Sequence, residues 1–295
     1  MEKLKICPIC SNNYKHYKDC VDYTVSHETF EIVSCVNCGF KFTNPRPEAN
    51  EIGKFYDSPA YISHSNNKKG FVNKVYQYIR KISLTKKLNI VASLNPSNKN
   101  ILDIGCGTGE FLNRISTNGY GATGIEPNVK AREKAIKNYN LNILPEEGIT
   151  TLSKNSYGII SMWHVLEHVH NLTDRVNAIQ NLLCENGYAI IAVPNYTSWD
   201  AHHYKQYWAS YDVPRHLYHF SPDVIKTLFK NAGMMHVQSL PLVFDSYYVS
   251  LLSSKYKNDP FPILNSMVNG LRSNLHAKKD PERYSSVIYI FQKKS

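Results

Sequence analysis

The stretch that decides the fold is residues 100–110, N-I-L-D-I-G-C-G-T-G-E. A short apolar run with one acid, Asp103, is followed at once by Gly105, Gly107 and Gly109, and then by apolar residues at helical spacing. This pattern predicts a strand, a tight glycine turn and a helix. Glycines let the backbone turn sharply and let a ligand lie against N–H groups at a helix start. The turn therefore predicts a small-molecule binding loop.

The residues around this turn indicate which ligand it binds. A dinucleotide fingerprint has a sixth-position glycine, but Glu110 stands there, and an acid at a helix N-terminus repels a pyrophosphate. A second apolar run, residues 122–125, ends in Glu126, where nucleoside-binding folds place a carboxylate for the ribose hydroxyls. The ligand should therefore have a ribose and no diphosphate. S-adenosylmethionine fits, because Asp103 and the local carboxylates offset its cationic ammonium and sulfonium.

Four motifs in sequence order point the same way. They are D-I-G-C-G-T-G-E-F-L, G-I-E-P, I-I-S-M-W-H-V-L-E-H-V and G-Y-A-I-I-A-V-P-N, within residues 101–195. The set resembles the ordered motifs of class I S-adenosylmethionine-dependent methyltransferases. The resemblance implies methyl transfer and a Rossmann-like α/β fold, with a seven-stranded, mostly parallel sheet, helices on both faces and the last strand inserted antiparallel. The alternation of strand and helix patterns after Glu126 also favours a parallel sheet.

Ligands in such sheets bind beyond the carboxyl ends of the strands. The residues expected to contact the cofactor at these ends are Asp103, Gly105, Cys106, Gly107, Gly109, Glu126, Pro127, Ile149 and Trp163. Methyl transfer is an in-line displacement at a sulfonium methyl, so the protein mainly positions the acceptor and excludes water. A base is needed only if the acceptor is a hydroxyl or an activated carbon.

The first 47 residues carry a second motif. Cys7 and Cys10 form C-P-I-C, Cys35 and Cys38 form C-V-N-C-G, and strand formers lie between the two pairs. Two C-x-x-C knuckles joined by a hairpin are typical of a structural zinc site with four thiolates, which leaves no open position for catalysis. We expect a zinc ribbon over residues 1–47. The F-K-F-T-N-P-R-P that follows resembles the joining segment of sugar C-methyltransferases, in which a zinc ribbon precedes the methyltransferase domain.

A linker and helices are expected over residues 48–98. The spaced aromatics of residues 52–61 indicate a short helix and turn, in which Tyr56 and Tyr61 either pack or fold over the cofactor. An amphipathic pattern over residues 70–94 indicates one or two helices ahead of the first strand.

Residues 99–295 are expected to form the methyltransferase domain, with an insertion at about residues 196–220. Aromatic and histidine residues fill this insertion, and neither a helical nor a strand period fits it. Long ordered loops of this kind are often lids or binding loops. Arg215 is a candidate to hold an anionic or hydroxylated substrate, and His216 or His219 to remove a proton from it. The same segment also fits a purely structural entry to the next helix.

The stretch W-H-V-L-E-H-V, residues 163–169, allows several interpretations. H-x-x-E-H is an inverted zinc-protease motif, but here it follows a buried strand by one residue. His164, Glu167 and His168 also resemble the E-x-x-E-H divalent-ion site of quinone O-methyltransferases, with His164 in place of the first acid. Alternatively, Glu167 and His168 are hydrogen-bonded caps of the next helix. His164, nearest the strand end, is expected as a catalytic residue in the active-site wall.

The methyl acceptor is only partly indicated. The His-rich insertion and the absence of an N-P-P-Y type motif favour a small-molecule oxygen or carbon acceptor, such as a quinone, a sugar or another secondary-metabolite-like compound. The net charge of +10 leaves a nucleic acid, tRNA or rRNA, as an alternative acceptor, although the lysines are scattered among acids. A non-catalytic protein that only binds S-adenosylmethionine is the third alternative.

The sequence predicts no transmembrane segment. No stretch near 18 consecutive apolar residues occurs, and residues 1–5 lead straight into the cysteine motif, so a cytoplasmic protein is expected. A helical, apolar insertion is expected at about residues 245–280. It could complete the pocket, contact a membrane surface or pair with another subunit. The sequence does not distinguish these roles, and it does not indicate the oligomeric state.

Overall fold

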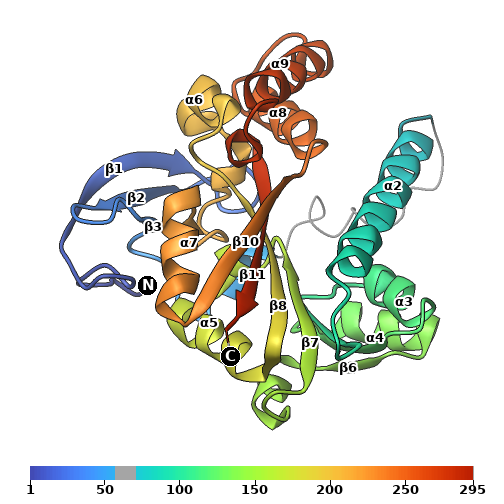
Figure 1. Ribbon diagram of the computed structural model, residues 1–295. Helices are drawn as coiled ribbons and strands as arrows, with labels where there is room; N and C mark the ends of the chain where they lie inside the picture. Colours follow the sequence, from blue (N-terminus) through green and yellow to red (C-terminus); the bar gives the residue numbers. More distant parts are fainter. Residues whose placement is uncertain (57–70, 295) are drawn as a thin grey trace.

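The computed structural model describes the backbone of residues 1–56 and 71–294 and the side chains of residues 1–56 and 78–294. A mostly parallel sheet occupies the centre of the molecule, and a smaller antiparallel sheet lies beside it, near the N-terminus (Figure 1). The central sheet contains the strands around the glycine turn, and the smaller sheet contains the strands between the two cysteine pairs.

The central sheet has seven strands in the order β10-β11-β8-β7-β4-β5-β6. Their bounds are β4 (Asn100–Ile104), β5 (Gly121–Ile125), β6 (Asn142–Leu144), β7 (Tyr157–Trp163), β8 (Leu183–Pro194), β10 (Met234–Pro241) and β11 (Ser286–Lys293). The strands from β8 to β6 run parallel, whereas β11 pairs antiparallel with both β8 and β10. The expected mostly parallel sheet with its last strand inserted antiparallel is confirmed.

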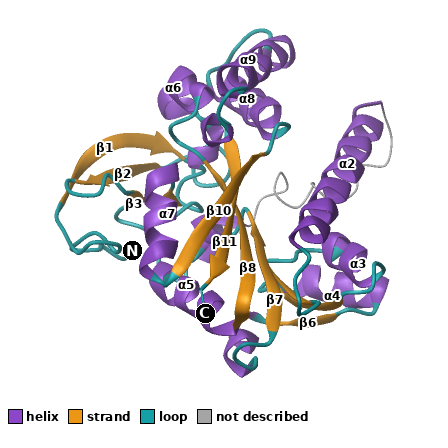
Figure 2. Ribbon diagram, in the orientation of Figure 1, coloured by secondary structure: helices purple, strands orange, loops and turns teal. Residues whose placement is uncertain are grey.

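Helices cover both faces of this sheet (Figure 2). They are α2 (Phe71–Leu94), α3 (Glu110–Ser116), α4 (Val129–Tyr139), α5 (Leu172–Leu182) and α7 (Pro222–Asn231). Successive residues of a strand point to opposite faces, so Leu102 of β4 joins a core with α5 and α7, while Ile101 joins a core with α2 and α3. Because both faces are buried, the strands are continuous apolar runs in the sequence.

Short 3-10 helices follow several strand ends. They are η1 (Ile52–Tyr56), η3 (Glu146–Thr151) and η4 (Leu166–His168). Helix η1 corresponds to the first half of the short helix expected over residues 52–61, and the second half, with Tyr61, lies outside the described residues.

The small sheet has the strand order β1-β2-β3-β9, with β1 (Tyr14–Val21), β2 (Thr29–Cys35), β3 (Lys41–Thr43) and β9 (Tyr218–His219). The first three strands form the expected N-terminal hairpin and its extension. The fourth, β9, comes from the insertion after β8 and pairs antiparallel with β3. His219, one of the two expected bases, is therefore 4% exposed inside this sheet, with Nε2 3.2 Å from Thr43 Oγ1. Its position is a structural one.

The insertion at residues 196–220 has more regular structure than its sequence pattern indicates. It contains α6 (Trp199–Tyr204), η5 (Lys205–Tyr207), η6 (Ala209–Tyr211) and β9. Five of its large aromatic side chains are at most 2% exposed, whereas Tyr196, Trp199 and Tyr207 are half-buried. The five are Tyr204, Trp208, Tyr211, Tyr218 and Phe220. They pack against the ribbon strands and against the core of the central sheet. The expected lid is thus a packed segment between the two sheets, and packing on several sides explains why no simple period fits it.

The expected substrate contact of Arg215 is wrong. Its guanidinium is 1% exposed and donates to Asp22 Oδ1 (2.8 Å), Asp212 Oδ1 (2.8 Å) and the Phe55 carbonyl (2.9 Å). A buried cation is tolerated when carboxylates and hydrogen bonds compensate it, and these partners do so. Arg215 therefore joins the insertion to the ribbon and to η1.

Helices α8 (Asp245–Tyr256) and α9 (Pro262–Ala277) occupy the expected helical insertion, and η7 (Pro281–Arg283) follows them. They lie between β10 and β11 in sequence and side by side at one end of the molecule, together with α6 (Figure 1). Within the described residues, no helix combines the length and the apolar character needed to cross a membrane.

Candidate functional site

The glycine turn connects β4 to α3 as the sequence predicts. Gly105, Gly107 and Gly109 have φ values of +73°, +57° and +80°, which L side chains rarely adopt. A Cβ at Gly105 would lie 2.4 Å from Val165 Cγ2, and one at Gly109 would lie 2.9 Å from Ala135 Cβ. A Cβ at Gly107 would meet no described atom within 4 Å. Packing thus requires two of the glycines, while Gly107 lies under an open surface.

Glu126 follows β5 and reaches this turn. It is 8% exposed, and its Oε2 accepts a hydrogen bond from the Gly107 N–H (2.7 Å), while Oε1 accepts one from the Asn128 N–H (2.9 Å). The carboxylate therefore holds the glycine turn against the start of α4. The glycine turn and Glu126, which the sequence analysis assigns to a ribose-containing ligand, are therefore in direct contact.

Asp103 lies on β4 just before the turn and is 2% exposed. The Ser161 hydroxyl on the neighbouring strand β7 donates to its Oδ1 (2.6 Å). Burial raises the pKa of Asp103 to about 6, while this hydrogen bond and the Lys87 ammonium act in the opposite direction. The carboxyl group is therefore an anion at neutral pH, held inside the edge of the sheet.

Trp163 is the last residue of β7 and packs against α3, the helix that follows the glycine turn. Its ring meets Phe111 edge-on, with centroids 5.5 Å apart, and Lys87 Nζ lies 4.1 Å from a Trp163 ring centroid. The Trp163 Nε1 is buried with no hydrogen-bond partner among the described residues. Burial lowers the pKa of Lys87 to about 8, against the influence of Asp103 and Asp245. Lys87 lies on α2. In the sequence it is one of two adjacent lysines, and no motif indicates that it lies near the candidate site.

Three further expected cofactor residues lie after β4, β5 and β6. The Cys106 thiol is buried below the turn and packs with Leu112 and Ala135, so this residue offers its backbone to the site. Pro127 is exposed ahead of α4, and Ile149 is half-buried on η3. Their contact with a cofactor stays a prediction.

His164 follows β7 with a positive φ of 56°. Its Nε2 lies 2.9 Å from Asp245 Oδ2, at the start of α8, and its Nδ1 lies 3.4 Å from Glu167 Oε1. Burial opposes the charged form, but these two carboxylates raise the pKa of His164 to about 10. The ring is therefore a cation at neutral pH that connects the strand end to α8. Asp245 is a site residue that the sequence did not reveal, because it lies 81 positions further along the chain.

Glu167, His168 and His216 converge, with one potential ligand atom of each within 4.8 Å of the others. Glu167 is fully buried, and neither of its carboxylate oxygens has a hydrogen-bond partner in the part of the chain that the structure describes. Although burial raises the pKa of Glu167, the nearby histidine rings, His164 above all, leave it lowered. The sequence pattern groups His164 with Glu167 and His168. In the structure the third member of the group is His216 of the insertion, while His164 pairs with Asp245.

Backbone carbonyls fix the tautomers of both histidines in this group. His168 Nδ1 lies 3.0 Å from the Arg215 carbonyl and 2.9 Å from the Tyr56 hydroxyl, and His216 Nδ1 lies 2.8 Å from the Ser210 carbonyl. A carbonyl only accepts, so each neutral ring carries its hydrogen on Nδ1 and a lone pair on Nε2. Burial lowers the pKa of His168 to about 4. His168 is therefore neutral at pH 7, and the Nε2 lone pair of each neutral ring can accept a hydrogen bond or bind a cation.

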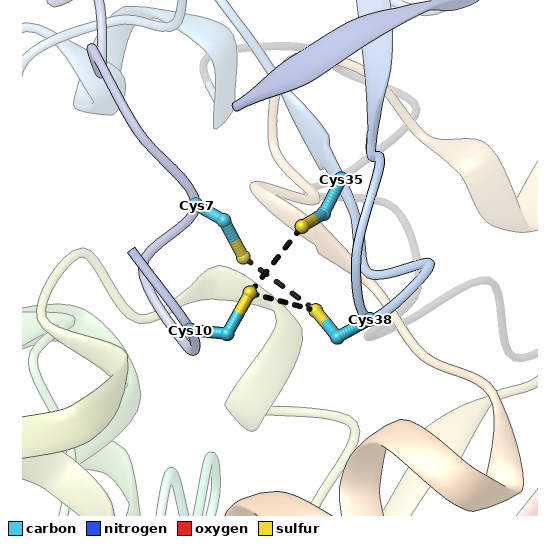
Figure 3. Close-up of side chains that lie close together, drawn as sticks. All are labelled: Cys7, Cys10, Cys35 and Cys38. Carbon is cyan, nitrogen blue, oxygen red and sulfur yellow. Dashed lines mark hydrogen bonds between the residues drawn. The ribbon is translucent and has the colours of Figure 1, made fainter. Parts of the chain in front are cut away.

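The four expected metal ligands also come together (Figure 3). The sulfur atoms of Cys7 and Cys38 lie 3.7 Å apart, those of Cys10 and Cys35 3.4 Å, and those of Cys10 and Cys38 3.5 Å. None of the four forms a disulfide. A tetrahedron with zinc–sulfur bonds of about 2.3 Å has edges of about 3.8 Å, so the spacing is close to that of a four-thiolate zinc site.

A family model described as a methyltransferase domain matches residues 76–239, more than half of the chain. No curated protein matches the chain. Among solved structures, phosphoethanolamine N-methyltransferase 2 of Haemonchus contortus in complex with S-adenosyl-L-methionine is 13% identical, with a TM-score of 0.54 over 96% of this chain and 69% of that chain. Magnesium protoporphyrin IX methyltransferase of Synechocystis PCC 6803 with bound SAH is 12% identical, with a TM-score of 0.54 over 81% of this chain and 97% of that chain.

At these identities the two structures show a shared fold alone. The family match goes further, because residues 76–239 contain the glycine turn, Glu126 and the cluster around Glu167. The match and the site geometry thus concern the same part of the molecule. The chain therefore belongs to the methyltransferase-domain family and is a class I S-adenosylmethionine-dependent methyltransferase.

Proposed function

We propose that this methyltransferase acts on a small molecule and methylates an oxygen or an activated carbon of a quinone, a sugar or another secondary-metabolite-like acceptor. The observation that supports the proposal is the cluster of Glu167, His168 and His216. Val165 packs against Gly105, so the cluster borders the glycine turn. Oxygen and carbon acceptors lose a proton on methylation, and the cluster contains imidazole nitrogens that accept one.

The residues around the glycine turn fit S-adenosylmethionine. Glu126 has the charge and position to accept hydrogen bonds from ribose hydroxyls, Asp103 offers an anion for the cationic methionine end, and Gly107 leaves an open surface between them. S-adenosylmethionine, when bound, supplies an electrophilic methyl group on its sulfonium. The proposed contacts are Asp103, Gly105, Cys106, Gly107, Gly109, Glu126, Pro127, Ile149 and Trp163.

His216 is the proposed catalytic base. Its Nδ1–H donates to the Ser210 carbonyl, which leaves the Nε2 lone pair to take the proton of the acceptor. The Glu167 carboxylate, buried beside the ring, stabilises the imidazolium that forms. His164 is already protonated at neutral pH, so its proposed role is to donate a hydrogen bond and to hold Asp245 and Glu167 in the active-site wall.

A structural zinc ion is proposed for Cys7, Cys10, Cys35 and Cys38. Their sulfur spacing supports it, and a four-thiolate site has no position left for substrate. The thiols also fit the reducing cytoplasm, where disulfides are rare, and this is the location we propose.

An acceptor assay tests the proposed substrate class. Radiolabelled S-adenosylmethionine is incubated with the purified zinc-containing chain and with catechols and quinols, keto-sugar nucleotides, or tRNA and rRNA. The proposal expects label in a small hydroxylated or enolisable compound and none in RNA. Methylated RNA, together with RNA binding that weakens steeply as salt rises, would instead support the nucleic-acid alternative that the +10 charge leaves open.

The pKa of Asp103 predicts how cofactor affinity depends on pH. Its value of about 6 means that the carboxylate is ionised at pH 7.5 and takes a proton as the pH falls to 5. His164, with a pKa of about 10, stays charged over this range. About a tenth of the carboxyl groups remain ionised at pH 5, so even if the neutral form does not bind, the affinity for S-adenosylmethionine should fall by at most about tenfold over this range. Equilibrium dialysis measures this, and Asp103→Asn should bind weakly at every pH; a wild-type affinity that stays constant from pH 7.5 to 5 would contradict the assignment.

A further inference from the structure

Helix α9 distributes its side chains in an unusual way. The residues it buries are small or polar: Ser266, Asn269, Gly270, Ser273 and Ala277. The residues it exposes are mostly large and apolar, with exposed fractions of 40–69%: Ile263, Leu264, Met267, Val268, Leu271 and Leu275. A surface helix of a globular protein normally faces the core with its apolar stripe. In α9 the arrangement is reversed.

The inner face of α9 is fixed by specific contacts. Ser246 Oγ on α8 donates to the Gly270 carbonyl (3.2 Å), and Ser273 Oγ donates to Asp200 Oδ1 on α6 (2.7 Å). A Cβ at Gly270 would lie 2.6 Å from Tyr247 Cδ1, so the two helices approach closely there. A rotation of α9 that buried its apolar side would break these contacts. The apolar side therefore stays outside in the folded chain.

The exposed apolar residues form one continuous face. At about 100° per residue, Leu264, Met267, Val268, Leu271 and Leu275 fall within an arc of about 100°. Phe261, which is 66% exposed, extends the face at the N-terminal end of the helix. Figures 1 and 2 show α9 at the outer end of the molecule, beyond α8. We call Phe261 together with these α9 residues and Ile263 the α9 face.

Most of the charges around the α9 face are positive, and directly after Lys279 the Asp280 carboxylate lies 3.4 Å from Arg283. Five basic side chains are exposed between residues 246 and 279: Lys255, Lys257, Arg272, Lys278 and Lys279. The one acid in this range, Asp259, is half-buried and accepts hydrogen bonds from the Phe261 N–H and the Asn265 amide. A second copy docked through the same face would bring these like charges together, at an electrostatic cost. An anionic lipid surface complements them.

We propose that the α9 face binds the surface of an anionic lipid bilayer, with α9 lying in the headgroup region and its apolar side chains inserted. A helix with an apolar face flanked by Lys and Arg binds in this way, through buried apolar area and attraction to anionic lipids. The helix lies on the bilayer and does not cross it. This inference is independent of the acceptor and of the proposed base. Helix α9 packs against α8, and α8 begins at Asp245, the ion-pair partner of His164, so one helix separates the α9 face from the active-site wall.

Vesicle flotation of the full-length, zinc-containing chain tests the proposal. The probes are vesicles of phosphatidylcholine with phosphatidylglycerol, and vesicles of phosphatidylcholine alone. The chain should float with the anionic vesicles, and molar salt should weaken this binding. Leu264→Ser together with Leu271→Ser should lower the partition coefficient roughly tenfold or more for each leucine, because each loses its buried apolar area. Both positions are at least half exposed in the free chain, so these variants should fold normally.

The matched control is Ile136→Ser together with Met235→Ser, which removes exposed apolar side chains from α4 and β10. It should leave vesicle binding unchanged. Equal losses in the control and in the α9 variant would overturn the proposal, as would a wild-type chain that does not float with anionic vesicles. A chain that ignores vesicles but forms a dimer that the α9 substitutions dissociate would also overturn it, in favour of a second copy.

Discussion

Cys35→Ser combined with Cys38→Ser should abolish zinc binding and unfold the N-terminal ribbon. The wild-type chain is expected to contain about one zinc ion, held by four thiolates whose sulfur atoms lie within 4.8 Å of one another, three of the pairs at 3.4–3.7 Å. The apparent free energy of structural zinc binding, about 10–16 kcal/mol in zinc-finger peptides, exceeds what a sheet of this size contributes by packing. Elemental analysis of the purified variant measures the metal, and thermal unfolding measures the loss of stability.

The effect should spread beyond the ribbon. Strand β9 of the insertion completes the ribbon sheet, and the Asp22 carboxylate compensates the buried guanidinium of Arg215. Loss of the ribbon would leave that cation without one of its partners, at a cost of several kcal/mol. Since His216 follows Arg215 directly, methyl transfer should be lost as well, although no cysteine of the ribbon touches the glycine turn.

The control is Cys184→Ser, which changes a half-buried free thiol of β8, outside the cluster. This variant should keep its zinc and its unfolding temperature. A double variant at Cys35 and Cys38 that retains the metal, or a wild-type chain that stays folded after zinc is chelated, would show that zinc does not hold this sheet.

His216→Asn should produce the second-largest effect, on turnover. The Asn amide can still donate to the Ser210 carbonyl, as the imidazole Nδ1–H does at 2.8 Å, but the Nε2 lone pair is gone. General base catalysis contributes typically 10²–10⁴-fold, so kcat should fall by about that factor while the affinity for S-adenosylmethionine stays within about twofold. Single-turnover rates with an active acceptor measure kcat, and thermal unfolding confirms that the variant is folded.

Two comparisons separate a base from a packing residue. His202→Gln changes an exposed histidine of the same insertion, and it should leave turnover unchanged. The second comparison is made within His216→Asn itself: its single-turnover rate should fall while its unfolding temperature stays unchanged, whereas loss of a packing residue would lower that temperature as well. If His216→Asn turns over at the wild-type rate, the histidine is structural and the proposed base is wrong.

The parts of this molecule that local sequence patterns encode were predictable. Three glycines with positive φ values mark the turn after β4, because few other residues adopt that backbone. Two C-x-x-C pairs mark the cysteine cluster, and the apolar runs of a doubly covered parallel sheet mark its strands. Glu126 was predictable because a fixed strand–helix–strand length separates it from the turn.

The unpredicted features are contacts between distant parts of the chain. Arg215 meets Asp22 across 193 positions, and no local pattern distinguishes this buried ion pair from a substrate contact. The convergence of Glu167 with His216 depends on how the insertion folds back, which its irregular sequence does not indicate. The orientation of α9 could not be predicted for another reason: the small and polar residues of its inner face hydrogen-bond to α6 and α8, whereas hydropathy alone suggests that the apolar face is the buried one.

Calorimetric titration of S-adenosylmethionine, of its demethylated product and of NAD into the zinc-containing chain tests the central claim most directly. A class I methyltransferase with Asp103 and Glu126 in its cofactor site should bind the first two ligands at one site per chain and should not bind NAD. Glu126→Ala should weaken binding by about 1–3 kcal/mol, because the ribose hydroxyls lose a charged partner. Binding of NAD with no heat from S-adenosylmethionine or its product would contradict the account.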